Sequence, residues 1–309
     1  MPAPLHVALA TEARLSDLTA DDRLLLAELR RRGVRAEPAV WDAPRDWETF
    51  DAVVVRSCWD SHLRRGEFVE WAARVAASGA RLLNPAPLLV WNSDKRYLRE
   101  LSARGVAVVP TAWVSAAGGA APSLSDVLGA EGWDEAVVKP AISAGAYETW
   151  RTSAGRAPAD EARFAALVRS GAGDVLVQPF VEQVLREGEW SLVFVAGRFS
   201  HAVRKRPAAG DFRVQSQFGG LTVAAAPPAT LVGDADAVLG AAARCTGLRA
   251  DEILYARVDG VEREGRLLLM ELECVEPDLF FETAPGAAGR VADALESGGS
   301  RELGDAAVV

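Results

Sequence analysis

Short apolar runs alternate with amphipathic stretches over the first third of the chain. The runs that predict strands are His6–Ala10, Ala36–Val40, Ala52–Val55 and Arg81–Leu83. Between the first two runs, Thr19 is the expected N-cap of a helix that has Asp21 in its first turn and ends at Gly33. A second helix is expected over Phe68–Ala77. Alternating strand and helix units of this kind predict a parallel sheet with helices on its faces, in a domain that ends near residue 90.

The remaining two thirds of the chain carry a second set of strand signals. The expected strands are Val106–Val109, Ala136–Lys139, Val175–Gln178, Trp190–Val195, Arg198–Arg204, Ile253–Val258 and Arg266–Glu273. Ala196-Gly197 predicts a tight hairpin turn. The expected helices are Asp94–Ala103, one within 141–170, Ala229–Cys245 and Gly286–Leu295. Stretches 115–122, 152–159 and 224–229 are rich in Ala, Gly and Pro and are expected to be loops.

These elements predict a mixed α/β and α+β architecture in three parts. A chain of 309 residues exceeds one ordinary core. We expect an N-terminal α/β substrate domain over residues 1–90, a central sheet-bearing unit over 91–180 and a C-terminal unit over 181–309.

The composition limits which functions are open to the chain. With 34 basic and 43 acidic residues the net charge is −9, which argues against a nucleic-acid surface. The three cysteines form no C-x-x-C pair, so we expect a reducing compartment and no disulfide framework. There is no run of eighteen apolar residues and no signal-like N-terminus, so a cytoplasmic protein without a membrane segment is expected.

Three acidic residues near the C-terminal end are the clearest chemical signal. Side chains alternate along a strand, so Glu271 and Glu273 share a face, and a hairpin through Gly265 brings Asp259 opposite them. At about 5 Å and an effective dielectric near 20, each pair of carboxylates repels by roughly 3 kcal/mol. A divalent cation relieves that repulsion. The alternative is a solvated acidic hairpin end.

Further upstream, a lysine and a small-residue loop suit an anion. Lys139 ends an apolar run and is followed by the loop 141–146, whose backbone can approach a phosphate closely. Pro179 follows Gln178 and enforces an extended turn with free backbone groups, beside Phe180. Each signal taken singly is also compatible with ordinary surface residues.

Together these residues resemble the ATP-grasp ligases. The resemblance covers nearly the whole chain and is closest to the glutathione-synthetase-like branch, which includes a cycloserine-forming ligase. It rests on four segments that occur in the family's order: Trp91-Asn92-x-Asp94-Lys95, Gly188-Glu189-x-Ser191, Tyr255-x-Arg257-x-Asp259 and Glu271-x-Glu273-x-x-Glu276-Pro277. One departure is Glu273, where many members have Asn. Glutamate also supplies oxygen ligands, so the metal site is retained.

The resemblance implies a role for each matching residue. The residues expected to bind ATP are Lys95 and Lys139 at the phosphates, Ser143 and Gly145 in the phosphate lid, Gln178, Phe180 and Val181 at the adenine, and Glu189 at the ribose. The expected ligands of two Mg²⁺ ions are Asp259, Glu271 and Glu273.

The implied reaction is ATP-dependent amide formation through an acyl phosphate, on small amino-acid-like substrates, with release of ADP. Arg257 and Lys205 are expected beside the transferring phosphate. Arg213 lies in a polar loop and is expected to grip the substrate carboxylate, the alternative being a solvated loop arginine. Substrate contacts are also expected from Arg56, Ser57 and Asp60, which follow a strand at its carboxyl end.

Some alternatives stay open at this point. A phosphotransferase or a nucleotide-binding module that forms no amide would use the same fold. Within ligases, the sequence does not separate intramolecular cyclisation from joining of two molecules. An N-terminal domain rich in tryptophan also leads us to expect a homodimer.

Overall fold

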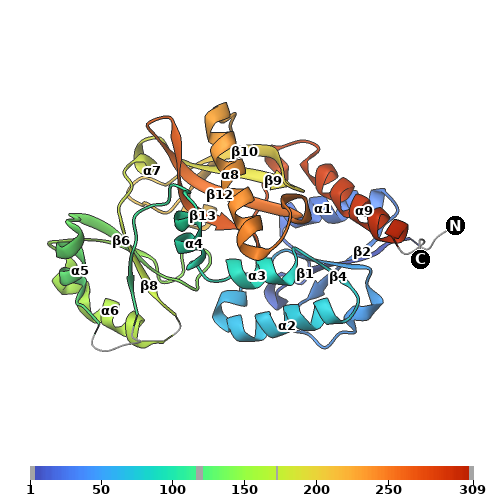
Figure 1. The fold of residues 1–309 in the computed structure, drawn as a ribbon, viewed down its shortest axis with the longest axis horizontal. Coiled ribbons are helices and arrows are strands. Elements are labelled where there is room, and N and C mark those ends of the chain that lie inside the picture. The colour runs from blue at the N-terminus through green and yellow to red at the C-terminus, as the bar shows by residue number, and fades with distance from the viewer. Residues whose placement is uncertain (1–3, 116–120, 172, 306–309) are drawn as a thin grey trace.

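The N-terminal unit is the parallel sheet that the sequence predicts. The structure is a computed structural model that describes residues 4–115, 121–171 and 173–305 (Figure 1). The strands of this unit are β1 (His6–Thr11), β2 (Arg35–Val40), β3 (Ala52–Val55) and β4 (Arg81–Leu83), and its helices are α1 (Ala20–Arg31), α2 (Arg65–Ala77) and α3 (Ala86–Asn92). The sheet order is β2-β1-β3-β4, and every neighbouring pair is parallel.

The start of α1 follows from its capping residue. The Thr19 hydroxyl oxygen accepts a hydrogen bond from the Asp22 backbone N–H at 3.0 Å. Asp21 and Asp22 place negative charge in the first turn, where it is favourable. Beyond the last turn, Gly33 has a φ of +83°, which glycine adopts without strain.

The central unit is an antiparallel sheet with two strands that the sequence analysis missed. Its strands are β5 (Ala112–Val114), β6 (Glu135–Pro140), β7 (Trp150–Ser153) and β8 (Val175–Pro179), in the order β5-β8-β6-β7. Its helices are α5 (Leu124–Glu131) and α6 (Ala157–Arg169). The loop expected over 152–159 is wrong: β7 pairs with β6, and α6 begins at Ala157-Pro158, because proline is favoured in a first helical turn. Of the loop expected over 115–122, residues 116–120 lie outside the described residues.

The C-terminal unit is a five-stranded antiparallel sheet in the order β11-β10-β9-β12-β13. Its strands are β9 (Glu189–Val195), β10 (Arg198–Arg206), β11 (Leu221–Ala224), β12 (Tyr255–Arg263) and β13 (Arg266–Glu273), and its helices are α7 (Gln183–Arg186), α8 (Ala229–Thr246) and α9 (Ala287–Asp305). The predicted hairpin between β9 and β10 is confirmed, and both turn residues, Ala196 and Gly197, have positive φ. The loop expected from residue 224 shortens to the four residues between Ala224 and Ala229.

Two expectations before the central sheet need correction. Val106–Val109 is not a regular strand: Val108 makes one isolated bridge to Leu269, and the Val109 N–H donates to the Leu269 oxygen at 3.0 Å. The helix expected from Asp94 is α4 (Tyr97–Ala103), which begins three residues later. Lys95 therefore lies in a turn, where its N–H donates to the Ala141 oxygen at 2.9 Å.

Helices near the expected boundaries pack against other units. Tyr97, Leu98 and Leu101 of α4 belong to the same core as α8 and the C-terminal sheet. The last helix, α9, lies beside α1 (Figure 1), and Val291 shares a core with α1 and β1. The domain boundaries near residues 90 and 180 stay predictions.

The tryptophans of the N-terminal unit are largely used in its own core. Trp41, Trp47 and Trp71 are buried, and the Trp71 ring packs edge-on against each of the other two. This packing removes them from the surface on which the homodimer was expected, so the homodimer stays a prediction without support from these side chains. Among the described residues, no helix has the length and apolar character needed to span a membrane.

Candidate active site

The predicted hairpin brings the acidic residues together. In the β12–β13 pair, Asp259 lies directly opposite Glu271, and Arg257 lies opposite Glu273. The register shifts immediately after Asp259, at Gly260, where a Cβ atom would lie 2.4 Å from the Leu268 oxygen. A glycine is therefore needed for the strands to approach at this irregularity.

Arg257 connects the two strands to the segment that follows them. Its Nε donates to Asp259 Oδ1 at 3.0 Å, and its Nη2 to Oδ2 at 2.9 Å and also to Glu273. Nη1 donates to the Asp278 oxygen at 3.0 Å. The planar fork of an arginine can hold several acceptors at once, and this one holds three residues in fixed positions.

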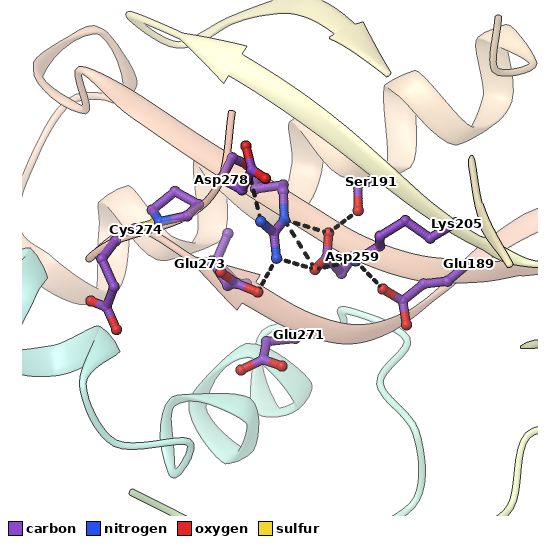
Figure 2. Close-up of polar contacts among 12 residues, drawn as sticks. Glu189, Ser191, Lys205, Asp259, Glu271, Glu273, Cys274 and Asp278 are labelled. Atoms are coloured by element: carbon purple, nitrogen blue, oxygen red, sulfur yellow. Dashed lines mark hydrogen bonds and ion pairs between the residues drawn. The ribbon is translucent and has the colours of Figure 1, made fainter. Parts of the chain in front are cut away.

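Lys205 on β10 joins the same buried group. Its Nζ lies 2.5 Å from Glu189 Oε1 and 3.2 Å from Asp259 Oδ2. Figure 2 shows Asp259 between Ser191 and Lys205, and the Ser191 hydroxyl donates to Asp259 Oδ1 at 2.6 Å. Burial raises the pKa of Asp259, but Arg257 and Lys205 outweigh it and hold that pKa well below its usual range. The carboxylate is ionised and its oxygens are fully used.

Lys95 connects the acids of β13 to the central unit. Its Nζ donates to the Ser143 backbone oxygen at 2.6 Å and to the Ser143 hydroxyl at 3.1 Å. The same nitrogen lies 3.1 Å from Glu271 Oε1. One predicted phosphate-binding lysine thus contacts both a predicted metal ligand and the predicted lid.

Lys139 lies close enough to act on the same carboxylate. Burial lowers the pKa of Lys139, and the charge of Glu271 opposes that effect. Burial raises the pKa of Glu271, but Lys95 and Lys139 together bring it below its usual value. The structure therefore gathers two lysines and one carboxylate at one place, which no single sequence segment contains.

The loop after β6 lies against both terminal units. Gly145 has a φ of +57°, and its oxygen accepts a hydrogen bond from Gln217 Nε2 at 3.0 Å. The Tyr147 ring lies 5.2 Å from the ring of His62 in the N-terminal unit. The predicted lid is thus in contact with residues from both sides of the site.

The residues expected at the adenine lie where the central unit joins the C-terminal unit. The Gln178 amide is buried and donates to the Thr111 hydroxyl at 2.9 Å. The Phe180 ring packs edge-on against Phe212, with the Arg151 guanidinium 3.8 Å from its centroid. A cavity of about 480 Å³ opens beside this pair and is lined by Arg151, Leu185 and residues 207–212. Val181 packs in a small apolar cluster next to it.

The structure corrects the expectation that Arg56 and Ser57 face a substrate. The Arg56 side chain is 2% exposed, and its Nε lies 2.7 Å from Asp22 Oδ1. The Ser57 hydroxyl is buried 3.0 Å from the Thr11 hydroxyl. Asp60 is half-buried and accepts from Trp41 Nε1 at 2.9 Å. The strand end is where the sequence analysis placed it, but its first two side chains point into the protein.

Arg213 is also engaged within its own loop. Its Nη2 lies 2.8 Å from Asp211 Oδ2, and its guanidinium lies 3.6 Å from the Phe218 ring centroid. The structure does not bring it to the acids of β12 and β13, so its contact with a substrate carboxylate stays a prediction.

The predicted metal ligands are neighbours but do not converge. Among the described residues, no three His, Cys, Asp or Glu side chains form a ready-made metal site. Each of the acids is turned toward a basic partner: Glu271 to Lys95, Glu273 to Arg257 and Asp259 to both Arg257 and Lys205. Carboxylate oxygens suit Mg²⁺, and the side chains of Glu271 and Glu273 remain 31% and 29% exposed. These two acids fit a metal if they exchange their present partners.

Sequence reasoning missed two side chains at the site. Ser191 is a buried hydrogen-bond donor to Asp259, and its only signal was its place in Gly188-Glu189-x-Ser191. Glu276 was part of the segment that carries the resemblance but received no role. It lies between the acids of β13 and the N-terminal unit.

The chain is similar to a cycloserine synthetase in both sequence and fold. Residues 7–84 match a family model described as the N-terminal domain of D-cycloserine synthetase DcsG. The chain is 34% identical over 296 residues to the cycloserine biosynthesis protein DcsG of Streptomyces lavendulae, covering 94% of this chain and 97% of that protein. The crystal structure of D-cycloserine synthetase DcsG matches with a TM-score of 0.84 and 33% identity over 94% of this chain and 98% of that one.

More distant structures share the fold. A D-alanine–D-alanine ligase from Bacillus anthracis complexed with ATP gives a TM-score of 0.66 at 14% identity, over 97% of this chain and 99% of that one. The ATP-grasp ligase PsnB, complexed with a minimal precursor, Mg and ADP, gives 0.60 at 15% identity, over 94% and 97% of the two chains.

Proposed function

Because this chain belongs to the family of D-cycloserine synthetase DcsG and is an ATP-grasp ligase that performs ATP-dependent carboxylate–amine ligation, we propose how its residues divide that work and on what substrate. A carboxylate oxygen of a small amino-acid-like substrate attacks the γ-phosphorus of ATP, and the bond to the β-phosphate oxygen breaks to release ADP. An amine nitrogen then attacks the acyl carbon, the carbon–oxygen bond to phosphate breaks, and the nitrogen loses a proton. The contact of Lys95 with both Glu271 and Ser143 supports this proposal most directly.

The phosphates are bound by lysines and a lid. Lys95 and Lys139 neutralise phosphate charge, and the backbone N–H groups of the loop that contains Ser143 and Gly145 are the neutral donors. Lys95 needs only to exchange Glu271 for a phosphate oxygen, since its nitrogen already lies at the lid.

Glu271, Glu273 and Asp259 are the proposed ligands of two Mg²⁺ ions. Magnesium, when bound, would neutralise negative charge on the phosphates and so lower the activation free energy of phosphoryl transfer. Glu271 and Glu273 supply oxygens after leaving Lys95 and Arg257. Asp259 supplies one only by giving up a donor, because Arg257, Lys205 and Ser191 already use its oxygens.

Arg257 and Lys205 are the cations proposed to stabilise the negative charge that develops during phosphoryl transfer. Burial lowers the pKa of Lys205, but Asp259 and Glu189 outweigh it and raise that pKa, so the ammonium is retained. Both side chains are held in place by other residues, so little reorganisation is needed during the reaction. Arg213 is proposed to reach a substrate carboxylate after leaving Asp211.

The nucleotide is proposed to occupy the junction of the central and C-terminal units. Gln178, Phe180 and Val181 face the adenine there, beside the 480 Å³ cavity. Glu189 takes the ribose hydroxyls. Its contact with Lys205 supports adjacent positions for the ribose and the phosphate cations on β9 and β10.

We propose further that the carboxylate and the amine belong to one molecule, so that the product is a ring of the cycloserine type. The identity and near-complete coverage of the cycloserine biosynthesis protein support this choice over joining two molecules.

The test is an ADP-release screen over D- and L-amino acids, including side chains that carry a second amine, with product analysis by mass spectrometry. The proposal expects ADP, phosphate and an amide that is one water lighter than its substrate. A phosphorylated product would indicate a phosphotransferase instead, and AMP would exclude the acyl phosphate. Size-exclusion chromatography of the same protein tests the homodimer.

A further inference from the structure

The segment after β13 is fixed by side chains instead of by a strand partner. Each backbone oxygen from Cys274 to Asp278 accepts a hydrogen bond from a side chain. The donors, in chain order of the acceptors, are Asn84 Nδ2 at 2.7 Å, the Tyr255 hydroxyl at 3.0 Å, Trp59 Nε1 at 3.2 Å, Arg56 Nη2 at 2.9 Å and Arg257 Nη1 at 3.0 Å. The backbone of Glu276 is therefore held rigidly between the N-terminal unit and the acids of β13.

The side chain of Glu276 lacks the partner that its backbone has. Its Oε2 atom is buried and, among the described residues, has no hydrogen-bond partner. A buried carboxylate oxygen without a donor is unfavourable, because it has lost its hydration and gained no hydrogen bond in return. A fixed backbone that keeps such an oxygen in place is typical of a site that receives its donor from a ligand.

The surroundings of Glu276 define what that ligand is. Burial, followed by the nearby charge of Glu273, raises the pKa of Glu276 to about 8, and Lys95 opposes the shift. Burial, followed by the charge of Glu276, raises the pKa of Cys58, which lies three residues beyond the end of β3. The carboxylate thus lies between the phosphate-binding group and the N-terminal unit. A cation is the group that would satisfy it there, since two further acids lie on the same side.

Trp59 forms a wall beside this position. Its indole is anchored through Nε1 to the Glu276 backbone oxygen, while its side chain remains 41% exposed. Trp59 therefore presents a partly exposed apolar ring next to the Glu276 backbone.

We propose that Glu276 binds the α-ammonium group of the molecule whose carboxylate is activated. The inference rests on the proposed function, because an amino-acid-like substrate supplies both groups. An ammonium held by Glu276 keeps its proton and is not nucleophilic, so a second amine attacks the acyl phosphate. Glu276 would then determine both the substrate class and which nitrogen reacts.

The experiment removes the charge from each side of the contact in turn. The probes are the amino acid that gives the fastest ADP release in the screen and the matching α-hydroxy acid, which carries a hydroxyl in place of the α-amine and is otherwise identical. The variants are Glu276→Gln, which keeps the shape, and Glu276→Asp, which keeps the charge. Glu282→Gln changes an exposed acid six residues away and is the control.

For the unaltered protein we expect the KM of the amino acid to be about 10- to 100-fold below that of the hydroxy acid, as for a charge-assisted hydrogen bond. Glu276→Gln should remove most of that preference while the KM of ATP stays unchanged. Glu276→Asp should restore part of it. The control should behave as the unaltered protein does.

Two outcomes overturn the inference without touching the proposed function. One is that Glu276→Gln keeps the preference for the amino acid. The other is that it loses stability, seen as a lower melting temperature, while the ratio of the two KM values stays the same, which is the result of a purely structural carboxylate. Absence of ADP release from the unaltered protein with every amino acid overturns the proposed function itself.

Discussion

Arg56 and Asp22 form an ion pair inside the protein, with Nε and Oδ1 2.7 Å apart and side chains that are 2% and 3% exposed. The pair joins the end of β3 to the first turn of α1. Through Nη2, Arg56 also donates to the Pro277 oxygen at 2.9 Å and so reaches the segment that carries Glu276. Because its side chain is buried in these contacts, we expect Arg56 to support the active site from behind without contacting a substrate.

Removing one partner of this pair should be costly. Asp22→Asn leaves a buried guanidinium without its charge partner, so we expect the free energy of unfolding to fall by about 3–5 kcal/mol. Urea denaturation followed by fluorescence measures this change. At temperatures where the variant is folded, the KM for the amino acid should change by less than about threefold. A stable variant with a large KM defect would mean that Arg56 recognises the substrate after all.

The adjacent acid should give the opposite result. Burial, followed by the charge of Asp278, raises the pKa of Asp21 from 3.8 to about 7. The folded state therefore binds a proton that the unfolded state has released between these values, and stability is lost as the pH rises from about 4 through 7. Asp21→Asn removes this loss and should stabilise the protein at pH 8 relative to pH 4.

We expect a gain of about 2 kcal/mol at pH 8, below the limit of about 4 kcal/mol that the shift sets, because the charge is shared with Asp278. The measurement is the difference in unfolding free energy between variant and unaltered protein at pH 4 and pH 8. Other raised carboxyl groups contribute to both proteins and cancel in this difference. Equal differences at the two pH values would contradict the assignment to Asp21.

The same Arg→Lys substitution at two positions, 257 and 213, shows which arginine matters more for kcat. Arg257→Lys keeps the charge but loses the fork that holds Asp259, Glu273 and the Asp278 oxygen together, so kcat should fall by about 100-fold or more. Arg213→Lys alters a half-exposed loop contact with Asp211 and should reduce kcat by less than tenfold. Steady-state ADP release measures both. The reverse order would make Arg213 the central cation.

The lid contacts should affect nucleotide binding more than chemistry. Gln217→Ala removes the hydrogen bond to the Gly145 oxygen, and Tyr147→Ala removes the ring contact with His62. Each contact is exposed and modest, so we expect the KM of ATP to rise by about two- to tenfold with little change in kcat. An unchanged KM in the double variant would show that these contacts do not hold the lid.

The sequence predicted the metal hairpin because its signal is local. Alternation along β13 and the turn at Gly265 together determine that Asp259 faces Glu271. By contrast, β7 was missed because Trp150–Ser153 is short, and its pairing with β6 outweighs local composition.

The use of each side chain was harder to predict than its element. Arg56 was correctly placed at the end of a strand, but its partner Asp22 lies 34 positions away. The same holds for the five donors that fix residues 274–278, which come from distant segments. Only the folded chain shows that Glu276 is left without a partner.

We propose that Glu271 and Glu273 bind Mg²⁺ against the phosphates held by Lys95 and Lys139, and ADP release as a function of Mg²⁺ concentration tests this most directly. The measurement is made on the unaltered protein and on Glu271→Gln. We expect Mg²⁺-dependent release from the unaltered protein. The variant should need far more Mg²⁺ and turn over at least about 100-fold more slowly, although ATP still binds without the metal. Release of ADP by the variant at the original rate and the original Mg²⁺ concentration would show that Glu271 does not bind the metal.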